Sequence, residues 1–129
     1  MIESILIIPL CGLGKRFINS GYKKHKSLLA IDKVHMLERI IGKFPEKTVV
    51  YLITSLSIKK ELDKDEYLNK RKNLKLLNFV IIEDHTLGPA YTIFKALKDL
   101  PKSKPTYISY CDITWSWDNY KFTKPNRWM

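Results

Sequence analysis

The sequence predicts a three-layer α/β domain in which a parallel β-sheet is covered by helices on both faces. Four short apolar runs alternate along the chain with segments of helical periodicity, the pattern of a doubly covered parallel sheet. The first run, residues 4–10 (SILIIPL), is apolar almost throughout, which is typical of a central strand buried on both sides.

The apolar runs and the periodic segments between them define the expected elements. We expect parallel strands at residues 4–10, 48–54, 76–82 and 106–111, in the spatial order third, second, first, fourth. Helices are expected over residues 34–44, before the stop at Pro45, and over the charged segment 57–69. A third helix opens at Gly88 and Pro89, with an apolar stripe formed by Ala90, Ile93, Phe94 and Leu97.

The length and composition indicate one soluble domain. The 129 residues suit a single core, and no apolar run approaches the roughly 20 residues of a membrane helix. The N-terminal run carries Glu3 and lacks a basic segment and a cleavage site, so it is not expected to be a signal peptide. Cys11 and Cys111 form no CxxC pattern or Cys/His cluster, which argues against disulfide and zinc scaffolds. We expect a cytoplasmic location.

The domain is expected to occupy residues 1–118, followed by an irregular tail at 119–129 that has no apolar periodicity. We expect a chain that stops before its fold is complete. The strand at 106–111 would then have an unpaired edge, which favours self-association or pairing with a missing C-terminal half. Because the first and fourth strands are expected to be neighbours, Cys11 and Cys111 at their ends should approach each other.

A glycine-rich turn, LCGLGKRF at residues 10–17, follows the first strand. Gly12 and Gly14 let backbone N–H groups approach phosphate oxygens, and Lys15 and Arg16 supply positive charge. A dinucleotide-binding turn would have a third glycine where Phe17 stands, and a Walker A loop would need GK[ST] after four spacer residues. Both patterns are absent, so the turn predicts a phosphate site of another kind.

Several segments in order resemble the sugar-phosphate nucleotidyltransferases, also called sugar-nucleotide pyrophosphorylases. The pattern of that family, G-x-G-x-R followed by K-P-L, is similar to GLGKRF and to KSLL at Lys26, although His25 and Ser27 replace the flanking prolines. The run EDHTLGPA, from Glu83 through Gly88, is similar to the family's nucleobase loop, and Asp112 stands where the family keeps a metal-binding aspartate. The run YCDITWSWD is similar to a subgroup associated with capsule and surface-polysaccharide synthesis.

The resemblance implies a Rossmann-like nucleotidyltransferase (GT-A-like) fold and a reaction. A nucleoside monophosphate would pass from a nucleoside triphosphate to a sugar 1-phosphate or similar phosphomonoester, with release of pyrophosphate. Arg16 would hold the β- and γ-phosphates, and Lys26 would neutralise the α-phosphate and the incoming phosphate. Asp112 would bind Mg²⁺. The nucleotide would be bound by Leu10, Gly12, Gly14, Lys15, Glu83 and Gly88.

Glu83 also suggests a base preference. An ionised carboxylate can only accept hydrogen bonds, and cytosine offers an amino donor where uracil and thymine present a carbonyl oxygen. We therefore expect CTP to be preferred over UTP and dTTP. The alternative is that Glu83 only caps its loop and points to solvent.

The other candidate residues also have plain structural alternatives. Arg16 and Lys26 could be solvated surface charges, and Asp112 could be a strand-end cap. Trp115 and Trp117 could pack against the domain or form a stacking platform. The three histidines at positions 25, 35 and 85 are expected at the surface and not as catalytic bases, because nothing nearby in sequence orients them.

Two other function classes compete with the enzyme. The family's second metal-binding aspartate and its sugar-binding half lie beyond the residue count, so the chain could be a non-catalytic nucleotide-binding fragment. The net charge of +10 allows a basic RNA-binding module. However, the lysines of residues 59–75 are interleaved with acids, the pattern of a solvated helix and loop, so we do not expect nucleic acid as the partner.

Overall fold

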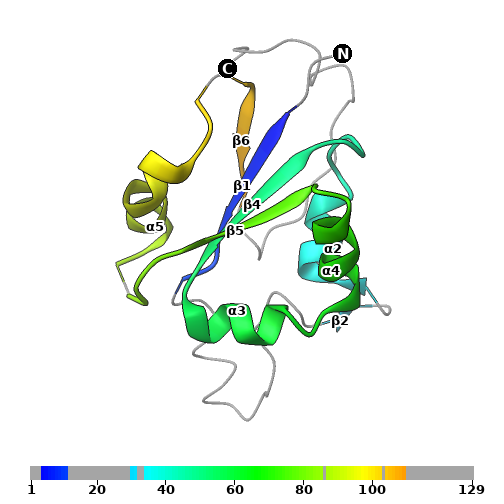
Figure 1. Ribbon diagram of the computed structural model, residues 1–129, viewed down its shortest axis with the longest axis horizontal. Coiled ribbons are helices and arrows are strands. Elements are labelled where there is room, and N and C mark those ends of the chain that lie inside the picture. Colours follow the sequence, from blue (N-terminus) through cyan, green and yellow to red (C-terminus); the bar gives the residue numbers. More distant parts are fainter. Residues whose placement is uncertain (1–3, 12–29, 32–33, 86, 103, 110–129) are drawn as a thin grey trace.

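The computed structural model describes residues 4–11, 30–31, 34–85, 87–102 and 104–109. Within these residues, four parallel strands form one sheet in the order β5-β4-β1-β6 (Figure 1). The predicted strands and their spatial order are confirmed, with shorter bounds than expected. The strands are β1 Ile5–Pro9, β4 Val49–Thr54, β5 Leu77–Ile81 and β6 Thr106–Ile108.

Strand β1 lies between β4 and β6 in the sheet, and every one of its side chains is buried. It pairs with β4 from Ile5 opposite Val49, and with β6 from Ile5 opposite Thr106. Successive side chains of a strand point to opposite faces, so Leu6 and Ile8 enter one apolar cluster while Ile5 and Ile7 enter another. A strand of this kind requires cover on both faces of the sheet.

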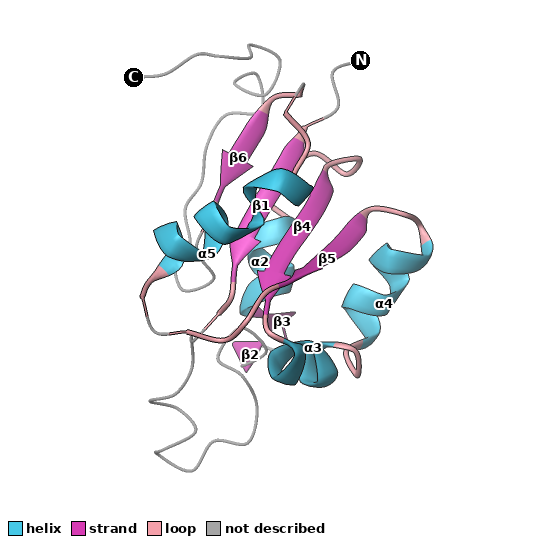
Figure 2. Ribbon diagram, turned by 60° about the vertical axis from the view of Figure 1, so that its left-hand side comes forward, coloured by secondary structure: helices cyan, strands magenta, loops and turns pink. Residues whose placement is uncertain are grey.

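Helices on the two faces supply that cover and make the three-layer α/β architecture. Helices α2 Met36–Ile41 and α4 Glu66–Asn73 lie on one side of the sheet and α5 Pro89–Ala96 lies on the other (Figures 1 and 2). Leu37, Ile40, Ile41 and Leu68 pack in the cluster that contains Leu6. The helix α3 Leu56–Leu62 and the short 3₁₀ helix η2 Leu97–Asp99 complete the described helices, none of which is long and apolar enough to cross a membrane.

The helix expected over residues 34–44 is shorter than predicted. Val34–His35 instead forms strand β3, which pairs antiparallel with β2 Ala30–Ile31, and the helix begins at Met36. The reason is a local cap: the extended His35 accepts a hydrogen bond at Nδ1 from the Glu38 N–H, at 3.0 Å. The expectation that His35 is a surface residue was also wrong, because only 9% of it is exposed.

The single charged helix expected over residues 57–69 is in fact two helices, α3 and α4. Asp65 separates them: its backbone is extended, and its carboxylate accepts from the Leu68 N–H at 3.0 Å, which caps α4. The same carboxylate oxygen lies 3.0 Å from Nε2 of His35. Asp65 therefore ties the start of α4 to the start of α2.

Replacing Asp65 with alanine should lower the free energy of unfolding by about 1–2 kcal/mol, because the substitution removes an N-cap and a partner of the buried His35 ring. Chemical denaturation with urea measures the loss. Asp65→Asn keeps an oxygen acceptor for the Leu68 N–H and should lose less. Equal losses for the two variants would mean that the cap contributes nothing.

The helix predicted to open at Gly88 and Pro89 is confirmed, but the predicted face is wrong. Thr92 and Ala96 are the residues of α5 that are fully buried against the sheet. Of the predicted stripe, Ile93 packs against the apolar cluster that contains Ile5 and Ile7, while Phe94 and Leu97 are 65% and 47% exposed. The Thr92 hydroxyl donates to the Gly88 carbonyl at 3.3 Å and lies 2.8 Å from Nε2 of His85, so its burial leaves no polar group unsatisfied.

Candidate functional site

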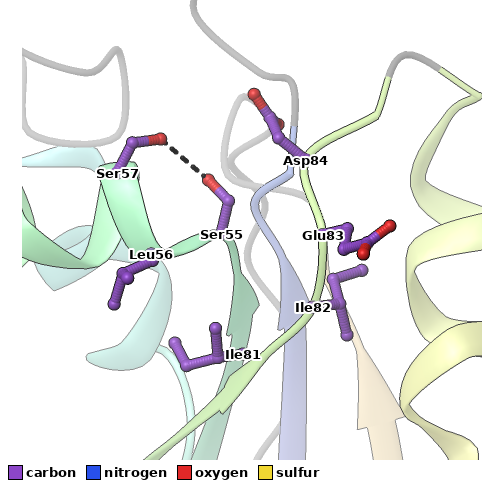
Figure 3. Close-up of a pocket in the computed structure, with 7 residues that line it drawn as sticks. All are labelled: Ser55, Leu56, Ser57, Ile81, Ile82, Glu83 and Asp84. Atoms are coloured by element: carbon purple, nitrogen blue, oxygen red, sulfur yellow. Dashed lines mark hydrogen bonds between the residues drawn. The ribbon is translucent and has the colours of Figure 1, made fainter.

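A pocket of about 480 Å³ lies where β4 and β5 end (Figure 3). In open parallel α/β sheets, ligands bind outside the carboxyl ends of the strands. The pocket lies at that edge of the sheet, one strand away from the place between β1 and β6 where the strand order reverses. The pocket has an apolar part and a polar part in its lining. Its seven lining residues are Ser55, Leu56, Ser57, Ile81, Ile82, Glu83 and Asp84.

The β4 side of the pocket is the start of α3. Ser55 is extended and precedes the helix without capping it through its side chain. Instead, the hydroxyls of Ser55 and Ser57 lie 3.1 Å apart, within hydrogen-bonding distance of each other (Figure 3). Leu56, between them, is 57% exposed. Two hydroxyls and an exposed apolar side chain therefore stand beside the cavity.

The β5 side of the pocket ends in two adjacent carboxylates. Glu83 and Asp84 are both exposed, and their side chains point in different directions (Figure 3). The Ile82 N–H just before them donates to the Thr54 carbonyl at 2.9 Å, which holds the two strand ends together. Neither carboxylate forms an ion pair with another described residue. The Glu83 carboxylate is thus accessible to a ligand.

The end of β1 lies close to this acidic segment. Burial raises the pKa of the Cys11 thiol to about 11, and the negative charge of Asp84 adds to the shift. Leu10, next to it, is fully buried, and its N–H donates to the Ile53 carbonyl at 2.8 Å. The Leu10 N–H is therefore bonded within the sheet and is not available to a ligand.

Gly88 sits where the β5 loop turns into α5. Its φ of 95° and ψ of 170° lie in a region that residues with a Cβ rarely adopt, although a Cβ at this position would meet no atom within 4 Å. The requirement for glycine is therefore conformational and not steric. Glu83 and Gly88 bracket one loop, as the sequence predicted.

The expectation that His85 is a surface residue with nothing to orient it was wrong. The ring is half-buried, and it has partners at both nitrogens: the Leu87 N–H at 3.0 Å and the Thr92 hydroxyl at 2.8 Å. The Tyr91 ring meets it edge-on, with centroids 4.6 Å apart. The partners of His35 are the Glu38 N–H of α2 and the Asp65 carboxylate before α4, and those of His85 are Leu87 in the loop and Thr92 in α5.

The remaining predicted site residues lie outside the described part of the chain. They are Gly12, Gly14, Lys15, Arg16, Lys26 and Asp112, and the same holds for His25, Cys111, Trp115 and Trp117. Within the described residues, no group of three or more His, Cys, Asp or Glu side chains is placed to hold a metal ion. Magnesium binding by Asp112 and phosphate binding by Arg16 and Lys26 stay predictions.

Comparison with known proteins identifies the fold. No protein-family model matches the chain, and no curated protein gives a significant match. Among solved structures, the chain is similar to a nucleoside-diphosphate-sugar pyrophosphorylase from Vibrio cholerae RC9, with a TM-score of 0.61 and 18% sequence identity. The likeness covers 83% of this chain and 47% of that one, so the chain spans about half the length of its neighbour. The two proteins share the α/β fold.

Proposed function

We propose that the chain is the nucleotide-binding part of a nucleotidyltransferase that acts on a phosphosugar-type acceptor. The observation that carries the proposal is the position of the pocket. It lies at the carboxyl ends of β4 and β5, on a fold similar to a sugar-nucleotide pyrophosphorylase, and it is lined by Glu83, which opens the loop that ends at Gly88. The sequence likeness to the nucleobase loop of that family supports the same location.

The proposed reaction joins two phosphates. An oxygen of a sugar 1-phosphate or similar phosphomonoester attacks the α-phosphorus of the nucleoside triphosphate. A new P–O bond forms as the bond to the β-phosphate oxygen breaks, and pyrophosphate leaves with that electron pair. Such a displacement depends on positioning and on neutralising negative charge. Arg16 would hold the leaving pyrophosphate and Lys26 the α-phosphate and the acceptor.

We also propose Mg²⁺ as the cofactor, with Asp112 as its ligand. A bound Mg²⁺ would shield the phosphate charges from one another. The described residues alone do not make a magnesium site. The proposal that the chain binds a nucleotide therefore rests on the pocket and on the loop that ends at Gly88. A role in capsule or surface-polysaccharide synthesis, suggested by residues 110–118, is a further part of the proposal.

The lining of the pocket suits a nucleobase. On the α3 side of the pocket, Leu56 and Ile81 offer apolar surface to the face of a ring, beside the hydroxyls of Ser55 and Ser57, while Ile82 and the Glu83 carboxylate point the other way, toward α5 (Figure 3). An ionised Glu83 can only accept, so it favours the amino group of cytosine over the carbonyl of uracil. We propose CTP as the preferred nucleotide.

Glu83→Gln is expected to lower the ratio of CTP affinity to UTP affinity on the order of 10-fold, because an amide can donate to the uracil carbonyl. Calorimetric titration of both nucleotides against wild type and variant measures the ratio. Asp84→Asn removes the same charge one position away, with a side chain that points elsewhere, and should leave the ratio unchanged. If the ratio does not move in Glu83→Gln, Glu83 does not read the base.

The activity itself is tested by pyrophosphate release from a panel of nucleoside triphosphates and sugar phosphates, with Mg²⁺ and again with EDTA. Release that requires an acceptor and Mg²⁺ supports the nucleotidyltransferase. Nucleotide binding without turnover supports the second candidate, a non-catalytic nucleotide-binding fragment. Salt-sensitive RNA binding without nucleotide binding would replace both with the RNA-binding module.

A further inference from the structure

The loop between β5 and α5 is closed by a chain of hydrogen bonds that passes through His85. The Leu87 N–H donates to Nδ1 of His85 at 3.0 Å, Nε2 lies 2.8 Å from the Thr92 hydroxyl, and that hydroxyl donates to the Gly88 carbonyl at 3.3 Å. This series of hydrogen bonds thus starts at the backbone of Leu87, passes through the side chain of Thr92 in α5, and ends at the backbone of Gly88 in the same turn.

One tautomer of the ring satisfies all three bonds. A ring nitrogen that accepts from an N–H carries no proton, so Nδ1 of His85 is bare and the neutral ring holds its proton on Nε2. Nε2 then donates to the Thr92 oxygen, and the hydroxyl hydrogen of Thr92 is left to donate to Gly88. Because each donor meets an acceptor, the arrangement is self-consistent.

The turn needs this external restraint because it is built on glycine. Gly88 reaches its φ of 95° without a steric penalty, but the same freedom lets it leave that conformation. Among the described residues, the bonds to the Gly88 carbonyl are long: the N–H and the hydroxyl of Thr92 both donate to it at 3.3 Å. The 2.8 Å contact between His85 and Thr92 is the shortest of the set, and Thr92 is fully buried, so water cannot replace it.

We propose that His85, acting through Thr92, is a positioning residue that holds the Gly88 turn in its nucleotide-binding conformation and so sets nucleotide affinity without touching the nucleotide. The proposal rests on the proposed function, since it assumes that Glu83 and Gly88 bind the nucleotide. His85 precedes Gly88 by three positions and follows Glu83 by two, so it restrains the loop between its two expected ligand contacts.

The test measures CTP affinity by calorimetry and thermal stability in the same variants. His85→Ala and Thr92→Val should each weaken CTP binding on the order of 10-fold, and the double variant should be little worse than either, because both remove one linked contact. Thr92→Ser keeps the hydroxyl and should bind CTP nearly as wild type does. His85→Asn keeps an acceptor for the Leu87 N–H but loses the contact with Thr92, so its CTP affinity should lie between that of wild type and that of His85→Ala.

Thr48→Val is the matched control. It also removes a buried threonine hydroxyl, whose oxygen lies 2.8 Å from that of Ser4, and it should cost similar stability. Because Thr48 lies at the opposite end of β4 from the pocket, the CTP affinity of Thr48→Val should match that of wild type. Wild-type affinity in His85→Ala, or an equal loss in Thr48→Val, would overturn the proposal.

A measurement without nucleotide separates the proposal from the proposed function. Nitrogen-15 NMR should show the His85 proton on Nε2, and exchange of the Leu87 amide should quicken in His85→Ala. If wild type binds no nucleotide but both signals are seen, the proposed function fails while the restraint of the turn stands. A proton on Nδ1, or unchanged Leu87 exchange, would overturn the restraint itself.

Discussion

Replacing Arg16 or Lys26 with alanine should weaken nucleoside triphosphate binding by roughly 10- to 100-fold, because each substitution removes a charge-assisted contact to phosphate. Pyrophosphate release should fall at least as far, since negative charge grows on the leaving pyrophosphate in the transition state. Titration calorimetry measures the affinity, and a coupled assay measures the release.

Lys70→Ala is the control for this pair. Lys70 is an exposed lysine on α4, a helix that lies against the face of the sheet and contributes no residue to the pocket lining. Its loss removes the same unit of charge and should leave the affinity unchanged. Equal losses for all three variants would mean that diffuse positive charge holds the nucleotide, and the assignment of Arg16 and Lys26 would have to be abandoned.

Leu52→Ala should lower the free energy of unfolding by about 2–5 kcal/mol, the largest single stability loss expected in this chain. Leu52 is fully buried in β4, in the cluster that joins α2 and α4 to the sheet, so its truncation leaves a cavity between layers. Urea denaturation followed by circular dichroism measures the change.

Two further variants keep this measurement interpretable if Leu52→Ala does not fold. Ile53→Val, on the opposite face of the same strand, should lose about 0.5–1.5 kcal/mol. Leu74→Ala, at a site that is 61% exposed, should change stability by less than about 0.5 kcal/mol. If Leu74→Ala lowered the free energy of unfolding as much as Ile53→Val does, the account of a core on both faces of the sheet would be contradicted.

The sheet was predictable because strands covered on both sides need continuous apolar runs. Residues 4–10 and 48–54 are such runs, and both became strands in the expected order. Helix limits were less predictable, since they depend on contacts between distant residues. Asp65, between α3 and α4, caps α4 while it binds His35, thirty positions earlier in the chain.

The face of α5 was mistaken for a related reason. Spacing alone favoured Phe94 and Leu97 as the buried stripe, but the helix buries Thr92, a polar residue whose partners lie in the preceding loop. The same contacts explain why His85 was missed. The sequence signal that could have revealed this contact was Thr92, which follows His85 by seven positions and lies one turn inside the helix that opens at Gly88.

For the candidate site, the glycine and the acid of one loop could be predicted, and the pocket beside them could not. Glu83 and Gly88 were expected from the resemblance of their run to the nucleobase loop of the sugar-phosphate nucleotidyltransferases, and the structure places Glu83 in the pocket lining and Gly88 at the end of the same loop. Ser55 and Ser57 were not, because they enter the site only through the pairing of β4 with β5, which brings two strand ends together. Hydroxyls that follow a buried strand were the signal for them.

The most direct test of nucleotide binding at this pocket is a titration of the assigned amide NMR spectrum with CTP. Changes in amide shifts concentrated at Ser55, Ser57, Glu83, Asp84 and Gly88 are the predicted result, because these residues line the pocket or close its loop. Shifts confined to the lysine-rich helix α4, or no shifts at millimolar CTP, would contradict a nucleotide site at the carboxyl ends of β4 and β5.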